Sequence, residues 1–267
     1  MKLLFSEQRA DYERYEFPYV VWSIPDPDET PADLLAAGFM PTAPDMSRYH
    51  MCRQIRVPLS GWRPSSENRR VLRKGQQISV ELVPRNEFAY TQERREFCKR
   101  YADAVFGQNV MSEARLDAHF GGRSVTHVLL FTDQPTGREV GAATAYVEGG
   151  RAASYWYAFY DTTYRSQNLG MFMMTSAAAL LAERGLPYLY LGTCYSRSAL
   201  YKTQFAGVEF FNGFCWSSDL AELRYLVART ESGSPRELLE TAEYLERFYE
   251  GGLADVVEAA RLRATAR

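Results

Sequence analysis

Cationic side chains are concentrated in one short stretch of this sequence. Positions 53 to 74 carry seven of them and a single acidic residue, Glu67: Arg53, Arg56, Arg63, Arg69, Arg70, Arg73 and Lys74. Positions 69, 70 and 73 bring at least two guanidinium groups to one side of a helix, and such groups match phosphate oxygens in pairs. The stretch is therefore a candidate contact for a phosphate backbone or a smaller anion. A basic helix face that is simply exposed to water would show the same pattern.

The overall composition limits what this stretch can do. The 267 residues include 31 Lys and Arg against 33 Asp and Glu, a net charge of −2, so a polyanion needs a local patch. Hydrophobic residues at 46% are typical of a globular protein and exclude disorder, collagen and a small disulfide scaffold. The chain has no apolar run of membrane-helix length and no signal-peptide core after Met1. We therefore expect a cytoplasmic protein with no membrane contact.

The cysteines and histidines show no pattern of a metal or hydrolase site. Cys52, Cys98, Cys194 and Cys215 lie far apart, and the three histidines complete no ligand spacing. The chain also lacks the Gly-x-Ser-x-Gly turn of many serine hydrolases. We expect reduced thiols, no metal and no cofactor.

The hydrophobic pattern predicts the elements that must position the cationic stretch and any reacting groups. It indicates three antiparallel strands over 125–132, 139–148 and 152–160, then a helix over 169–184 and a buried strand over 186–191. The other expected elements are strands at 19–24, 76–83 and 208–216, an extended segment at 49–59, and helical segments at 32–37, 65–75, 85–106, 112–120, 198–205, 219–229 and 235–264.

This element order is similar to that of the GNAT acyltransferase fold. The expected fold class is α+β, with a mixed, largely antiparallel sheet flanked by helices and a small N-terminal lobe. We expect an N-terminal lobe with a basic helix at 1–75, a GNAT-like transferase domain at 76–230 and a C-terminal helical tail at 231–267.

Two groups of motifs resemble the arginyl-tRNA and leucyl-tRNA protein transferases. They follow the family's order and approximate spacing over much of residues 34 to 214. The first group is Leu34-Leu35-Ala36-Ala37-Gly38-Phe39, Cys52-Arg53-Gln54-Ile55-Arg56-Val57-Pro58 and Trp62-Arg63-Pro64-Ser65-Ser66-Glu67-Asn68-Arg69-Arg70. The second is Phe159-Tyr160-Asp161, Asn168-Leu169-Gly170, Gly185-Leu186-Pro187-Tyr188-Leu189-Tyr190-Leu191-Gly192 and Tyr201-Lys202-Thr203-Gln204-Phe205. The chain departs from the family in retaining only Cys52 of its N-terminal cysteines and in having Thr193 where the family has an aromatic residue.

The resemblance implies an enzyme that moves an amino acid from aminoacyl-tRNA to the N-terminal amine of a protein or peptide. Its partners would be tRNA and that N-terminus, with aminoacyl-tRNA as co-substrate. The tRNA contacts would come from Arg63, Arg69, Arg70, Arg73, Lys74, Asn168 and Gly170.

The start of the helix expected at 169 is a second place for phosphate or adenosine. Gly170 leaves backbone amides accessible at a helix N-terminus, although it can equally serve close helix packing. An enzyme of this fold that uses acetyl-CoA needs another small residue where this chain has Phe172. We therefore expect the Phe172 ring to crowd a pyrophosphate and CoA to bind weakly.

The transfer itself needs little chemistry, because the donor ester is already activated and the acceptor is an amine. Asp161 can orient or deprotonate that amine, or it can simply cap the turn at Thr163 or Tyr164. Tyr201 and Lys202 can donate to the ester oxygens or the tRNA end, or they can be a core tyrosine beside a surface lysine. The remaining candidates for the acceptor or the aminoacyl end are Tyr160, Thr193 and Arg197, and either Lys202 or Arg197 can bind an acidic N-terminal side chain.

Two other functions remain open from the sequence. One is a CoA-dependent N-acyltransferase of the same fold. The other is a non-catalytic relative that only binds tRNA or peptides, which the reduced cysteine set and Thr193 favour.

Overall fold

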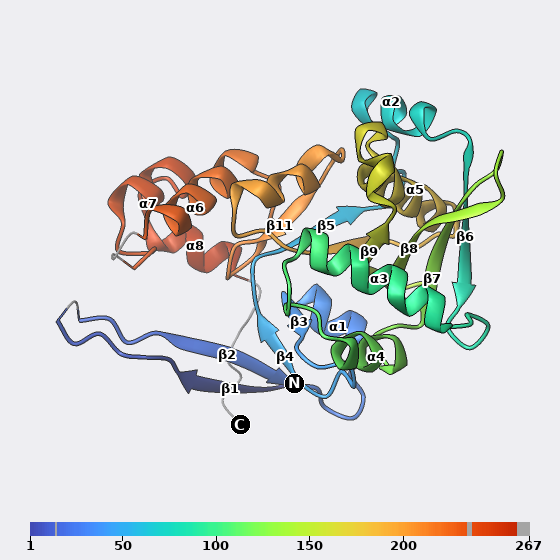
Figure 1. The fold of residues 1–267 in the computed structure, drawn as a ribbon. Coiled ribbons are helices and arrows are strands. Elements are labelled where there is room, and N and C mark those ends of the chain that lie inside the picture. The colour runs from blue at the N-terminus through green and yellow to red at the C-terminus, as the bar shows by residue number, and fades with distance from the viewer. Residues whose placement is uncertain (14, 234–236, 261–267) are drawn as a thin grey trace.

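The computed structural model describes residues 1–13, 15–233 and 237–260. Its N-terminal part is a four-stranded sheet in the order β1-β2-β4-β3, with one short helix beside it. The first two strands form a hairpin that extends away from the rest of the molecule (Figure 1). These elements are β1 (Lys2–Glu7), β2 (Tyr19–Ile24), α1 (Pro31–Ala36), β3 (Phe39–Pro41) and β4 (Tyr49–Met51).

An eight-stranded sheet forms the centre of the molecule, in the order β12-β11-β5-β10-β9-β8-β7-β6. All neighbouring strands in it are antiparallel except β9 and β10. Its strands are β5 (Gln54–Pro58), β6 (Ile78–Pro84), β7 (His127–Asp133), β8 (Arg138–Glu148), β9 (Ala152–Tyr160), β10 (Tyr188–Thr193), β11 (Glu209–Phe211) and β12 (Trp216–Ser217). The expected α+β class and GNAT-like strand order are confirmed.

The single last strand expected over 208–216 was wrong. The structure has two short antiparallel strands there, β11 and β12, joined by a turn. The Asn212 side chain accepts hydrogen bonds from the backbone N–H groups of Phe214 and Cys215, and Gly213 has a positive φ of 114°. Such a turn, built by an Asn side chain and a left-handed glycine, reverses the chain.

Helices cover both faces of the larger sheet. The helices that follow β6 pack with Val128 and Phe159 on one face, whereas α5 packs with Leu129 and Phe131 on the other. Successive residues of a strand point to opposite faces, so Val128 and Leu129 of β7 reach different helices. The bounds are α2 (Ser66–Lys74), α3 (Gln92–Val105), α4 (Glu113–Gly121), α5 (Leu169–Glu183) and α6 (Leu220–Ser232), with short 3₁₀ helices η1 (Thr162–Gln167) and η2 (Arg197–Gln204).

The helix expected from residue 85 begins only at Gln92. Thr91 caps it, because its hydroxyl accepts a hydrogen bond from the Arg94 N–H, and residues 85–91 form a turn after β6. Ser65, Ser112 and Asp219 cap α2, α4 and α6 in the same way. Side-chain caps of this kind satisfy amides that have no partner within the helix.

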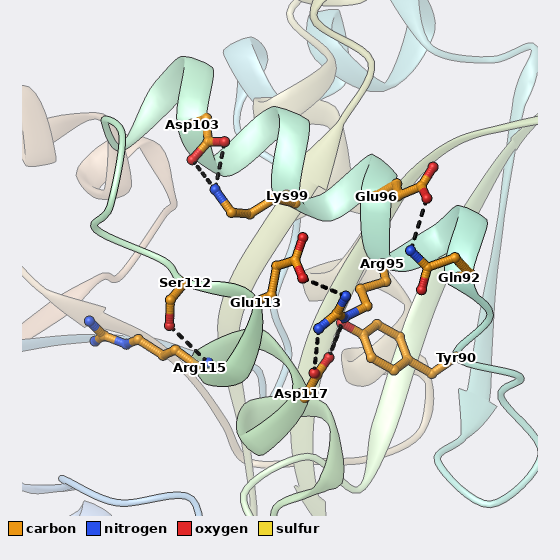
Figure 2. A network of polar contacts seen from close by, with 10 residues as sticks. All are labelled: Tyr90, Gln92, Arg95, Glu96, Lys99, Asp103, Ser112, Glu113, Arg115 and Asp117. Carbon is orange, nitrogen blue, oxygen red and sulfur yellow. Dashed lines mark hydrogen bonds and ion pairs between the residues drawn. The ribbon is translucent and has the colours of Figure 1, made fainter.

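An arginine of α3 holds α4 in place, as Figure 2 shows. Arg95 donates to Asp117 at 2.8 and 2.7 Å and to Glu113 at 2.7 Å. Tyr90 also contacts Asp117, at 3.3 Å. Because one guanidinium group binds carboxylates one helical turn apart, α4 is fixed in rotation as well as position.

The segment expected to form the N-terminal lobe, residues 1–75, contributes to both sheets. β5 pairs with β10 and β11 in the larger sheet, and α2 packs on α5. The division at residue 75 stays a prediction, as does the division at residue 230.

The C-terminal segment forms two short helices, α7 (Ala242–Phe248) and α8 (Leu253–Ala259), in place of one long one. Gly251, with a positive φ of 85°, lies between them. Residues 235, 236 and 261–264 of the expected helical tail lie outside the described residues. Within the described ranges, no helix is both long and apolar enough to cross a membrane.

The buried Glu222 side chain joins these helices to the sheet. Its carboxylate accepts hydrogen bonds from Tyr244 at 2.7 Å, Ser217 at 2.7 Å and Asn212 at 2.9 Å. Tyr249 adds a fourth, at 3.2 Å. Neutral donors thus satisfy a carboxylate that is 2% exposed, as the burial of a charge requires.

Candidate active site

The parallel strands β9 and β10 separate after a very short contact. They pair only at Leu189 with Ala153 and at Tyr190 with Ser154. Beyond these pairs β10 continues beside β5, where its register shifts between Tyr190 and Thr193. The strands therefore leave an opening that begins at Tyr155 and Leu191.

A bulge in β9 widens this region on the side of β8. The register between the two strands shifts at Thr144, which lies opposite both Trp156 and Tyr157. The Thr144 hydroxyl accepts a hydrogen bond from the Tyr157 N–H at 3.2 Å and contacts His119 Nε2 at 2.8 Å. A bulge of this kind redirects side chains, here the aromatic pair beside the opening.

Two cavities adjoin at the opening. The first, which we name the lobe cavity, has a volume of about 470 Å³ and lies among β3 and the loop after it, helix α4, the middle of β9 and the end of β10. The second, the helix cavity, has a volume of about 580 Å³ and lies among the ends of α3 and η2, the start of α5 and the end of β9. Five residues line both cavities: Tyr155, Trp156, Tyr157, Leu191 and Lys202. We refer to these five as the shared wall.

Lys202 is held in this wall by the strand beside it. Its ammonium group donates to the Thr193 carbonyl oxygen at 2.8 Å. Burial lowers the pKa of Lys202 below that of an ordinary lysine, although the nearby Cys194 opposes the shift. The side chain thus brings a positive charge to a point that both cavities reach.

Most of the candidates for catalysis and substrate binding in the second half of the chain meet at these cavities. Tyr160, Asn168, Gly170 and Tyr201 line the helix cavity, Thr193 lines the lobe cavity, and Lys202 lines both. A Cβ atom on Gly170 would lie 3.0 Å from the Tyr160 ring. Gly170 therefore serves close packing as well as leaving the helix start open.

The expectation that Phe172 crowds this helix start was wrong. Its ring packs on Gly75 at the end of α2, where a Cβ atom would come within 2.2 Å of it. It also contacts the Phe131 ring in the core, at 6.3 Å between centroids. Because Phe172 is one helical position past Met171, it faces α2 and the sheet, whereas Gly170 and Met171 line the cavity.

Asp161 and Arg197 do not line either cavity. Asp161 caps η1 by accepting hydrogen bonds from the backbone and hydroxyl of Thr163, and it also pairs with Arg138. Burial alone would raise the pKa of Asp161, but the hydrogen bonds from Thr163 and the charge of Arg138 hold it below its usual value. Arg197 pairs with Glu231 at 2.9 Å on the surface. The contacts of Asp161 with Thr163 match the alternative in which this residue only caps the turn.

The basic helix α2 borders the helix cavity through Glu67. Arg70 pairs with Glu67, and Arg69 donates to the Pro64 carbonyl oxygen at 2.8 Å. Arg63, Arg73 and Lys74 are exposed, and among the described residues no acidic side chain pairs with them. These three cations are therefore available to an anionic partner.

Sequence reasoning missed three residues of the site. Arg115 and His119 line the lobe cavity from α4, and Tyr155 lies in the shared wall. Positions 115 and 119 are one helical turn apart and so share a helix face, a signal that the sequence carried. Burial and the nearby charge of Arg115 together lower the pKa of His119 to about 4, so its imidazole is neutral near pH 7. Nothing in the sequence indicated that β9 separates from its neighbour at Tyr155.

Comparison with known proteins finds sequence similarity over the part of the chain that carries this site. The model for the C terminus of the arginine-tRNA-protein transferases matches residues 93–212, from α3 to the turn after β11. The aspartate/glutamate leucyltransferase of Ruegeria pomeroyi is 26% identical over 174 residues, which are 62% of this chain and 62% of that protein. The enzyme of the same name from Pseudomonas paraeruginosa is 26% identical over 195 residues, 69% of this chain and 81% of that one.

The similarity to solved structures is weaker than the similarity to these sequence relatives. The C-terminal domain of a putative lysylphosphatidylglycerol synthetase from Agrobacterium fabrum has a TM-score of 0.42 and 12% identity, over 61% of this chain and 51% of that one. The sequence matches agree with the resemblance of the motifs and support the assignment of this chain to the aminoacyl-tRNA–protein transferases.

Proposed function

We propose that the protein transfers an aminoacyl group from aminoacyl-tRNA to the N-terminal amine of a protein or peptide. The observation that carries this proposal is the pair of cavities that adjoin where β9 and β10 separate. Two substrates that enter from different cavities can meet only at the shared wall. The amine nitrogen then bonds to the ester carbon, the ester bond to the ribose breaks, and the ribose oxygen gains the proton that the amine loses.

The helix cavity is the better place for the 3′ end of the tRNA. The start of α5 offers backbone amides there, and Arg165 adds a positive charge. The helix α2 borders this cavity through Glu67, and its exposed cations can contact phosphates of the acceptor stem. A cavity of about 580 Å³ also falls within the usual range for small-molecule sites.

The lobe cavity suits an acceptor with an acidic first residue. Arg115 and Lys202 line it, and within the described part of the chain no aspartate or glutamate does. A carboxylate held by such groups forms charge-assisted hydrogen bonds. The relatives named aspartate/glutamate leucyltransferases support the same choice. We therefore propose a leucyl group as the donor and N-terminal aspartate or glutamate as the acceptor.

Positioning accounts for most of the catalysis in this proposal. The ester is an activated acyl donor, and a well-oriented amine gains a large effective concentration at it. The shared wall has only to bring the two groups together and stabilise the charge that develops on the ester oxygen.

A CoA-dependent N-acyltransferase is the second candidate, and the position of Phe172 favours it. Because this ring packs on Gly75, the start of α5 is not crowded as the sequence suggested. A pyrophosphate could approach the amides at Leu169 and Gly170.

A transfer assay with the full-length chain separates these candidates. tRNA charged with each of several radiolabelled amino acids is mixed with peptides that begin with Asp, Glu, Ala or Arg, and with N-acetylated copies as controls. We expect leucine on the Asp and Glu peptides and none on the acetylated copies. The second measurement is the affinity for acetyl-CoA, determined by calorimetry. Tight acetyl-CoA binding without aminoacyl transfer would replace the first proposal by the second.

A further inference from the structure

Tyr155 lies at the point where the two cavities adjoin. It is the first residue of β9 beyond the last pair with β10, and it lines both cavities. Its side chain is only 4% exposed. Leu191 faces the same point from β10 and is also buried. Of these two fully buried wall residues, only Tyr155 carries a hydrogen-bond donor.

The Tyr155 hydroxyl has no hydrogen-bond partner among the described residues. The large majority of buried polar side-chain atoms do have one, so such a hydroxyl needs an explanation. Two other polar groups of the wall do have partners. Trp156 Nε1 donates to the Ser124 carbonyl oxygen at 2.7 Å, and Lys202 donates to that of Thr193.

The surroundings of Tyr155 keep its hydroxyl protonated. Burial raises the pKa of this phenol well above its ordinary value, and the nearby Tyr201, Tyr101 and Tyr160 raise it further. The group is therefore protonated near neutral pH, where it acts as a donor and not as a base. A fixed O–H donor in a water-poor wall is suited to stabilising a negative charge that forms there.

We propose that Tyr155 is a catalytic residue, whose hydroxyl donates a hydrogen bond to the carbonyl oxygen of the aminoacyl ester during attack by the acceptor amine. This inference rests on the proposed aminoacyl transfer. As the nitrogen–carbon bond forms, the carbonyl electrons move onto that oxygen and the hydrogen bond strengthens. When the carbon–oxygen bond to the ribose breaks, the charge leaves that oxygen again. Tyr155 keeps its own proton throughout.

The variant Tyr155→Phe tests this role, because it removes only the hydroxyl. We expect single-turnover transfer from leucyl-tRNA to an Asp peptide to fall by about 100-fold or more, the usual effect of losing one such donor. The melting temperature should stay the same or rise, since a buried hydroxyl without a partner is removed. Tyr190→Phe is the matched control, because Tyr190 is equally buried on the neighbouring strand and lines neither cavity.

A stable analogue separates the transition state from simple binding. In this analogue, leucine is joined to the 3′-terminal adenosine through an amide instead of an ester. Its affinity should differ less than twofold between the natural protein and Tyr155→Phe, because the hydrogen bond strengthens only as charge develops. An equal loss of analogue affinity and transfer rate would overturn the assignment.

The remaining outcomes also decide the question. If the natural protein is active and Tyr155→Phe transfers leucine at the same rate, Tyr155 has no catalytic role and the proposed function stands. If the natural protein transfers no amino acid from any charged tRNA, the proposed function fails and the role of Tyr155 fails with it.

Discussion

His119 shows how one buried side chain of the site affects stability. Its pKa is about 4 in the folded protein, whereas an unfolded chain gives histidine about 6.5. The unfolded state therefore binds the proton more readily between these values. The stability contributed by neutral His119 is complete above about pH 6.5 and is lost as the pH falls toward 4, by about 3 kcal/mol in all.

Urea unfolding at pH 7.5 and pH 4.5 measures this effect. We expect the His119→Gln variant to lose less stability between the two pH values than the natural protein, because glutamine does not titrate. Acidic groups such as Asp33, whose pKa is lowered by the Thr30 backbone hydrogen bond, lose stability in both proteins and cancel in the comparison. Equal losses in the two proteins would mean that folding does not lower the pKa of His119.

Asp161 is a candidate catalytic residue whose contacts favour a structural role. We expect Asp161→Asn to cost about 1 kcal/mol or less, because asparagine can still cap the turn and the ion pair with Arg138 is partly exposed. Transfer should stay within about threefold of that of the natural protein. Thermal melts and single-turnover assays on this variant check both statements, and a loss of about 100-fold in turnover at unchanged tRNA affinity would restore the general-base role.

At the scale of elements, α2, which borders the helix cavity through Glu67, and Arg63 just before it provide exposed positive charge. Each phosphate contact that is removed should reduce the slope of log affinity against log salt by about 0.7 to 0.9. We expect Arg63→Ala with Arg73→Ala to reduce the slope for tRNA by about 1.5. The matched control is Arg184→Ala with Arg224→Ala, which removes two exposed charges after α5 and on α6. A slope that changes equally in both proteins would place the tRNA elsewhere.

At the scale of the whole molecule, the two cavities separate the two substrates. Arg115 lines only the lobe cavity and Arg165 lines only the helix cavity. We expect Arg115→Met to raise the KM for an Asp peptide about tenfold, the effect of losing one hydrogen bond to a charged group, with tRNA affinity unchanged. Arg165→Met should weaken tRNA binding and leave the KM for the Asp peptide unchanged.

Steady-state kinetics at varied peptide concentration give the KM for the peptide, and a tRNA-binding assay gives the tRNA affinity. Both are measured for each of the two variants. Each protein serves as the control for the other, since both lose one guanidinium group. If both variants weaken the same substrate, the cavities are not divided between donor and acceptor.

Much of the fold followed from local features of the sequence. Ser65 and Ser112 mark helix starts because a side-chain oxygen can satisfy a free amide within three residues. The antiparallel strands β7, β8 and β9 could be predicted from their alternating side chains and from the turns between them. The order of these elements, together with the motifs, was enough to indicate the fold class and the family.

Only the tertiary structure decided how the site is assembled. Phe172 packs on Gly75, nearly a hundred positions away, and that contact directs its ring away from the cavity. Tyr155 lies in the shared wall only because β10 separates from β9 and continues beside β5. Asp161 was paired by Arg138 on a neighbouring strand. Caps and alternation depend on residues a few positions apart, whereas the direction of a ring and the separation of two strands depend on contacts between distant segments.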